Sequence, residues 1–145
     1  DVYKRQIDAG NDGVDVSGSQ VEIINCEFIR IADKAISAGE NSLINARNII
    51  IKKASLGVVA KDLSIVNIQN SEIIESEVVF CAFQKKNEFG PSRIGARNMT
   101  YSKFKEENLI EEGSSLKLDG EKVHNYRDDV RKYLYGNEYG KETVK

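Results

Sequence analysis

The sequence has no tryptophan, one proline, one histidine and two cysteines among its 145 residues. Two cysteines are too few for a disulfide-rich scaffold, and with a single histidine they do not supply the ligands of a structural zinc site. The longest apolar run, Val78–Phe83, is much shorter than the roughly 18 residues that a membrane span needs. A net charge of -2 lacks the basic excess that is typical of nucleic-acid binders.

A chain of this length is expected to fold as one ordinary domain that buries a core of its own. Isoleucine, asparagine, serine and glycine are frequent. This composition favours β structure, because branched apolar residues suit strands, and asparagine and glycine suit tight turns.

The clearest pattern is an internal repeat. Four serines recur at spacings of 23, 22 and 28 residues, and an asparagine follows each serine six positions later. The longest spacing is a unit of about 22 residues with about six residues inserted. A fixed period of this size is the signature of a repeat architecture. The serines are Ser19, Ser42, Ser64 and Ser92, and the asparagines are Asn25, Asn48, Asn70 and Asn98.

Apolar and polar residues alternate within each unit, as they do in strands. Three short strands in one unit cannot close a core, but parallel pairing with the next unit stacks their apolar faces. We therefore predict an all-β parallel β-helix with about four coils of about 22 residues over residues 7–104. Residues 105–145 are predicted to form a last coil remnant and a C-terminal cap. One outward column is Glu22, Asn45, Asn67 and Gly95.

The asparagine column is predicted to form the corners between strands, because asparagine tolerates left-handed backbone better than other non-glycine residues. With this column, the coil period and the inward Ile/Val columns, residues 8–104 resemble the right-handed parallel β-helix proteins of the pectate-lyase-like superfamily. The resemblance implies that fold and leaves the activity open, because the fold hosts many functions.

The two ends suggest a piece of a longer protein. Asp1–Gln6 resembles a translated adaptor sequence, so we set residues 1–6 aside as a non-native leader. The coil around Ile7–Val16 has no cap comparable to the C-terminal one. We therefore expect the chain to be the C-terminal part of a longer β-helix, with upstream coils of the same chain as its neighbours.

The two cysteines fall in different columns of the repeat. Cys26 is predicted to point into the core, and Cys81 to point outward in the column of Asp15, Ser37 and Val59. They lie about three coils apart, which exceeds the reach of a disulfide. Both are predicted to be free thiols.

An acidic segment near the N-terminus offers two further interpretations. Asp8, Asp12 and Asp15 are weak calcium candidates, although aspartate and glycine are also ordinary turn residues. The same segment is similar to part of the polygalacturonase-type glycoside hydrolases, which makes Asp12 and Asp33 weak catalytic candidates by resemblance. Lys34 stands where that family has a second catalytic aspartate. We read the match as shared coil pattern, with no catalytic residue assigned and no cofactor other than this calcium.

The insertion in the fourth unit, Gln84–Pro91, is its most distinctive feature. Insertions in repeat proteins gather on binding faces. We therefore take Gln84, Lys85, Lys86 and Phe89 as candidate binding residues for a sugar ring or an acidic chain. The alternative is a plain loop with Phe89 folded onto the stack.

These observations predict a non-catalytic β-helix module of a larger exported or cell-surface protein. It would present a rigid face for contact with a polysaccharide or a surface protein, without nucleic acid and without a membrane span. The alternative is a polysaccharide-active hydrolase or lyase with its remaining catalytic residues upstream, and a third interpretation is an architectural spacer.

Overall fold

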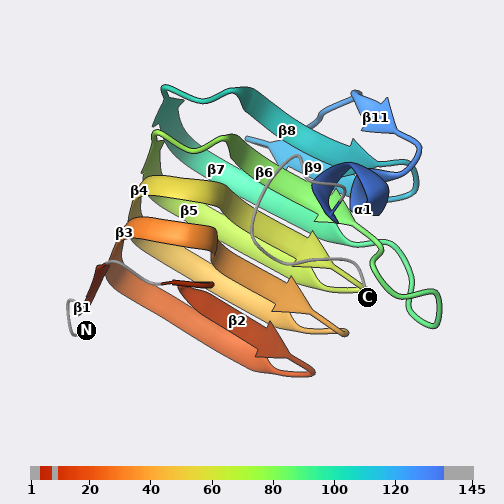
Figure 1. Cartoon of the computed structure of the whole chain (residues 1–145), viewed down its shortest axis with the longest axis horizontal. Coiled ribbons are helices and arrows are strands. Elements are labelled where there is room, and N and C mark those ends of the chain that lie inside the picture. The colour runs from red at the N-terminus through yellow and green to blue at the C-terminus, as the bar shows by residue number, and fades with distance from the viewer. Residues whose placement is uncertain (1–3, 8–9, 136–145) are drawn as a thin grey trace.

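The computed structural model describes residues 4–7 and 10–135. It is a parallel β-solenoid of about five coils, each of about 22 residues, with one short helix near its C-terminal end (Figure 1). The predicted all-β fold is confirmed. No helix in the described part of the chain is long and apolar enough to cross a membrane.

Eleven strands and the short helix make up the described chain, and every strand pair is parallel except the one between β9 and β10. The long strands β3 and β4 bend through most of a coil without a break (Figure 1). The elements are β1 (Lys4–Ile7), β2 (Val14–Ser17), β3 (Gln20–Gly39), β4 (Leu43–Lys61), β5 (Ile65–Ile74), β6 (Val78–Phe83), β7 (Arg93–Ser102), β8 (Glu106–Glu111), β9 (Ser115–Leu118), β10 (Glu121–Lys122), β11 (Tyr126–Arg127) and α1 (Val130–Tyr133).

Segments of these strands stack into three parallel runs, which we call stacks A, B and C. Stack A holds residues 20–24, 43–47, 65–69, 93–97 and 115–118. Stack B holds residues 4–7, 26–29, 49–52, 71–74 and 99–102. Stack C holds residues 14–17, 34–39, 56–61, 78–83, 106–111 and 126–127.

The corner between stacks A and B is built by the predicted asparagine column. Asn25, Asn48, Asn70 and Asn98 have φ angles of 55°, 55°, 53° and 51°, in the left-handed region. Their amides also bond along the solenoid axis: Asn48 Nδ2 donates to Asn25 Oδ1 at 2.9 Å, and Asn98 Nδ2 donates to Asn70 Oδ1 at 2.6 Å. The asparagine ladder is confirmed.

The serine column has a structural reason as well. The buried hydroxyls of Ser42, Ser64 and Ser114 each accept a hydrogen bond from the backbone N–H of the preceding serine in the column, at 3.0 Å. The Ser92 hydroxyl instead donates to the carbonyl oxygens of Ala60 and Phe83, at 2.6 and 3.1 Å. Ser114 therefore marks a fifth coil, where four were predicted. The serine–asparagine pattern did not indicate this coil, because Gly120, with a φ angle of 85°, replaces asparagine at the corner.

The inward side chains of all three stacks form one continuous core. Ile44, Val66 and Val58 in the middle coils are fully buried, whereas Val14 and Val16 on β2 are only half-buried. Cys26 is half-buried and packs against this core, close to its predicted inward position. The end of the solenoid formed by β2 is thus less covered than its middle.

A second apolar cluster lies on the outer face of stack C. The segment Asp129–Tyr135 runs over this face, where Val130 and Leu134 are buried. The outward prediction for Cys81 was incomplete: its side chain leaves the solenoid interior but is fully buried under this segment. The other members of the cluster on stack C are Leu56, Val59, Val78, Phe83 and Leu109.

The C-terminal segment covers the side of stack C. Leu134 and Tyr135 are buried there, while Tyr126 on β11 is exposed. At the other end, residues 4–6, which we had set aside, form most of β1 and pair with residues 26–28. The remainder of the leader, residues 1–3, and the tail 136–145 lie outside the described residues.

Candidate functional site

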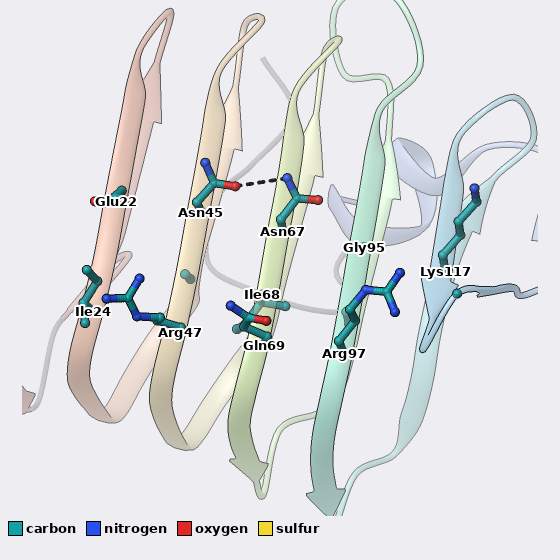
Figure 2. A pocket seen from close by; sticks show the side chains of 13 residues that line it. Glu22, Ile24, Asn45, Arg47, Asn67, Ile68, Gln69, Gly95, Arg97 and Lys117 are labelled. Atoms are coloured by element: carbon teal, nitrogen blue, oxygen red, sulfur yellow. Dashed lines mark hydrogen bonds between the residues drawn. The ribbon is translucent and has the colours of Figure 1, made fainter.

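The outer face of stack A carries an open groove of about 380 Å³ that runs across several coils (Figure 2). Alternation in the strands turns two columns of side chains out into it, while their neighbours fill the core. One column is Glu22, Asn45, Asn67, Gly95 and Lys117, and the other is Ile24, Arg47, Gln69 and Arg97.

Amide groups form the middle of the first column. Asn67 Nδ2 donates to Asn45 Oδ1 at 3.1 Å, so the two side chains are fixed relative to each other. Figure 2 shows the other end of the Asn67 amide, Oδ1, directed towards β7 at Gly95. Because Gly95 has no side chain, the column has a gap in the next coil.

Positive charge dominates the groove. Arg47, Arg97 and Lys117 line it and are exposed, against a single carboxylate, that of Glu22. Within the described part of the chain, no carboxylate lies within ion-pairing distance of these three cations. Two strand spacings separate Arg47 from Arg97, which is about 10 Å along the axis. The groove is therefore a row of available donors on a chain of net negative charge.

Sequence reasoning missed this groove, although it identified one of its columns as outward. The signal was the position five residues after each marker serine, which holds Ile24, Arg47, Gln69 and Arg97. The register between strands brings the arginines together, and they are 50 residues apart in sequence.

The candidates Asp12 and Asp33 do come together, around Lys34 on stack C. The Lys34 ammonium lies 3.0 Å from Asp33 Oδ2 and 4.0 Å from Asp12 Oδ1, and the Lys34 backbone N–H donates to Asp12 Oδ1 at 3.1 Å. The Lys34 side chain is fully buried, and the ring centre of Tyr135 is 5.6 Å from its ammonium. This is a buried ionic cluster at the edge of the second apolar cluster.

The two carboxyl groups of this cluster, those of Asp12 and Asp33, have different surroundings. Burial raises the pKa of Asp12, and the attraction of Lys34 only partly offsets this. Asp33 instead holds the ammonium directly and is itself buried. Their closeness agrees with the resemblance that suggested them, but Lys34 occupies the position between them that a substrate or a cation would need.

The calcium candidates are not gathered into a site. Asp12 faces the Lys34 ammonium, Asp15 is exposed, and Asp8 lies outside the described residues. No group of three metal-ligating side chains exists in the part of the chain that the structure describes. The single histidine, His124, is exposed and lies beside Tyr126.

Residues 84–91 form the predicted loop, between β6 and β7, and it projects from the solenoid (Figure 1). Gln84 Nε2 donates to the carbonyl oxygens of Lys86, Asn87 and Phe89, at 3.1, 3.4 and 2.6 Å. Asp62 Oδ1 accepts from the backbone N–H groups of Lys85 and Lys86 at 2.7 and 2.8 Å. The loop is therefore held by its own hydrogen bonds.

The side chains proposed for binding in this loop also have intramolecular partners. The Lys85 ammonium lies 4.9 Å from the Tyr135 ring centre. Lys86 donates to Glu40 at 2.5 Å, which lowers the pKa of the Glu40 carboxyl and raises that of Lys86. Phe89 is half-buried. These contacts give each residue a structural role, and a ligand role for them stays a prediction.

No protein-family model matches the chain, and searches of curated proteins and of solved structures find no match either. The groove and the chemistry of its side chains are therefore the observations that bear on function.

Proposed function

We propose that the chain is a non-catalytic β-helix module of a larger exported or cell-surface protein, and that its stack A groove binds an anionic glycan. The observation that carries the proposal is the row of Arg47, Arg97 and Lys117 along an open groove, where no carboxylate of the described residues is paired to them. A rigid, extended row of donors suits an extended polymer that carries regularly spaced anions and hydroxyl groups.

The outer face of stack C is already covered. The segment ending at Tyr135 covers stack C, and the loop side chains Gln84 and Lys86 bond within the molecule. Stack A is the face on which a hollow, exposed amides and cations without a described carboxylate partner occur together. Glycan contact there is favoured over contact at the insertion loop, where the sequence had placed it.

The right hand of the helix and membership of the pectate-lyase-like superfamily belong to this proposal too. They are supported by the asparagine ladder, the coil length and the parallel pairing of every coil with the next. The half-buried Val14 and Val16 support a neighbouring coil, because β2 offers it apolar surface and a strand edge.

A polysaccharide-active enzyme is the second candidate, and the ionic cluster favours it. Burial raises the pKa of Asp12, and the Asp33 carboxylate lies 3.0 Å from the Lys34 ammonium, so the two carboxyl groups have different surroundings, as an acid and a base require. Against it, Asp33 and Lys34 are buried and lie on stack C, away from the stack A groove.

One assay separates the two candidates. Polygalacturonate, alginate and neutral glucans are incubated with the protein, with and without calcium, and both reducing ends and unsaturated products are followed, together with retention in affinity electrophoresis. We expect an acidic glycan to retain the protein without turnover. The double variant Arg47→Gln/Arg97→Gln should lose this retention. The control variant Arg93→Gln changes an exposed arginine of β7 outside the groove and should keep it.

Turnover that disappears in Asp12→Ala or Asp33→Ala would replace the proposal with the enzyme. Neither turnover nor retention would leave the architectural spacer as the account of the fold. Retention that Lys85, Lys86 and Phe89 variants abolish, with the groove variants unaffected, would move the site to the insertion loop.

A further inference from the structure

Gly95 is an anomaly in the groove. It lies inside β7, where glycine weakens a strand, and strand glycines mark bulges or places of close approach. The register between β5 and β7 runs through Asn67 and Gly95 without a shift, and the φ angle of Gly95 is not in the left-handed region. Neither a bulge nor a special backbone conformation accounts for this glycine.

Packing restricts this position less than it restricts other glycines of the solenoid. A Cβ atom at Gly95 would meet one side-chain atom, Asn67 Oδ1, at 3.1 Å. At Gly57 and Gly13, by contrast, a Cβ atom would lie 2.7 and 2.5 Å from a backbone carbonyl oxygen of the next coil. Those two glycines are required by close backbone packing, whereas Gly95 leaves a gap that opens into the groove.

The gap is bordered by complementary groups. Asn67 Oδ1 is an acceptor directed into it, and one N–H of the same amide is donated to Asn45. Lys117 follows Gly95 in the column, and Figure 2 shows the Arg97 guanidinium extending from β7 towards β9 beside it. An acceptor on one side and two cations on the other define the chemistry of what fits between them.

We infer that the gap at Gly95 is the specificity-determining position of the groove and holds one anionic sugar unit, an inference that rests on the proposed function. A hydroxyl of the unit donates to Asn67 Oδ1, and its carboxylate or sulfate accepts from Arg97 and Lys117. The gap fixes where along the groove an acidic glycan is held.

Two other polyanions fit less well. Single-stranded nucleic acids are held largely by stacking of bases on aromatic side chains, and none of the described residues that line the groove is aromatic. An acidic peptide supplies the carboxylates, but it offers Asn67 Oδ1 mainly backbone N–H groups in place of the regularly spaced ring hydroxyls of a sugar. Both are outcomes of the test below.

The test fills the gap without removing a charge. Gly95→Asn places an amide next to Asn67 Oδ1, where it can extend the Asn45–Asn67 ladder, so the fold is expected to be kept. Affinity is measured calorimetrically for polygalacturonate, for its neutral methyl ester, for dextran sulfate, for polyglutamate and for single-stranded DNA. We expect Gly95→Asn to weaken binding of the anionic glycan roughly tenfold, as Lys117→Gln does, and Arg93→Gln to leave it unchanged.

The outcomes are distinct. If the wild-type chain binds no glycan, the proposed function fails. If it binds an anionic glycan and folded Gly95→Asn binds equally well, the proposed function stands and the inference about Gly95 is overturned. Equal binding of the methyl ester, of polyglutamate or of single-stranded DNA also overturns it. The comparison of polygalacturonate with dextran sulfate identifies the anion as carboxylate or sulfate, and either one supports the inference.

Discussion

At the scale of single residues, the corners decide how the coils close. The corner between stacks A and B uses asparagine, but the corner between stacks B and C uses long charged side chains in the same left-handed conformation. Left-handed backbone costs an ordinary residue roughly 1–2 kcal/mol, and asparagine less, because its short side chain bonds locally. The second column is Arg30, Lys53, Glu75 and Lys103, with φ angles of 55°, 60°, 61° and 56°.

Replacing a charged corner residue by asparagine is therefore expected to stabilise the protein. Lys53 is exposed, and we predict that Lys53→Asn raises the free energy of unfolding by about 0.5–1 kcal/mol, measured by urea denaturation. The neighbouring Lys52→Asn is the control. It makes the same lysine-to-asparagine change one residue earlier, within the extended part of β4. Asparagine is a poor strand residue, so the free energy of unfolding should be unchanged or lower. Equal gains in both variants would contradict the explanation.

These two corners show what the sequence could predict at residue scale. The corner between stacks A and B can be predicted from its asparagines, because few residue types tolerate left-handed backbone. These asparagines are Asn25, Asn48, Asn70 and Asn98. The corner at Lys53 cannot be predicted from its residue types. The surrounding strands impose left-handed backbone there on residues that disfavour it. Similarly, the burial of Lys34 could not be predicted from its own coil. It depends on Tyr135, about one hundred residues later in the chain.

At the scale of elements, the segment Asp129–Tyr135 turns one outer face of the solenoid into a second core. The outward column of stack C becomes apolar along the chain, from Asp15 and Ser37 to Val59, Cys81 and Leu109. That trend was a signal that something covers the later coils, but the sequence does not say which segment. The groove shows the same limit, because its arginines come together only through the register of distant strands.

Detaching this segment should expose Cys81. Leu134 is buried in the second cluster, and Leu134→Asp puts a charge there, so we expect the segment to leave stack C. In the wild-type protein, Cys81 is fully buried and burial raises its thiol pKa well above the ordinary value of 9.0, so it should not react with N-ethylmaleimide. In Leu134→Asp, we expect rapid labelling of Cys81, measured by peptide mass spectrometry.

Two controls test whether the labelling of Cys81 reports loss of the covering segment. Cys26 is half-buried in the first full coil and should label at the same rate in both proteins, which also reports that the solenoid is intact. Leu63→Asp makes the same chemical change at an exposed leucine and should leave Cys81 protected. Protection of Cys81 in Leu134→Asp would mean that strand packing, and not the segment, shields this thiol.

At the scale of the whole molecule, the two ends of the solenoid differ. The last coils carry β10, β11 and the covering segment, whereas no described strand pairs with the outer edge of β2. The N–H of Gly13 donates to the Lys34 carbonyl at 2.8 Å, and successive peptide groups of a strand point to opposite sides. The N–H groups of Val14 and Val16 are therefore directed at the open edge, beside half-buried apolar side chains.

An edge of this kind pairs readily with another strand, so we predict that the chain associates with itself as its concentration rises. Sedimentation velocity should show the shift. Val16→Pro removes one N–H from the open edge and is tolerated in an edge strand, and it should keep the protein monomeric. Val16→Ile keeps that N–H and the apolar side chain, so it should associate like the wild type. Circular dichroism verifies that both variants remain folded. A wild-type chain that stays monomeric at millimolar concentration would show that the edge is protected without a partner.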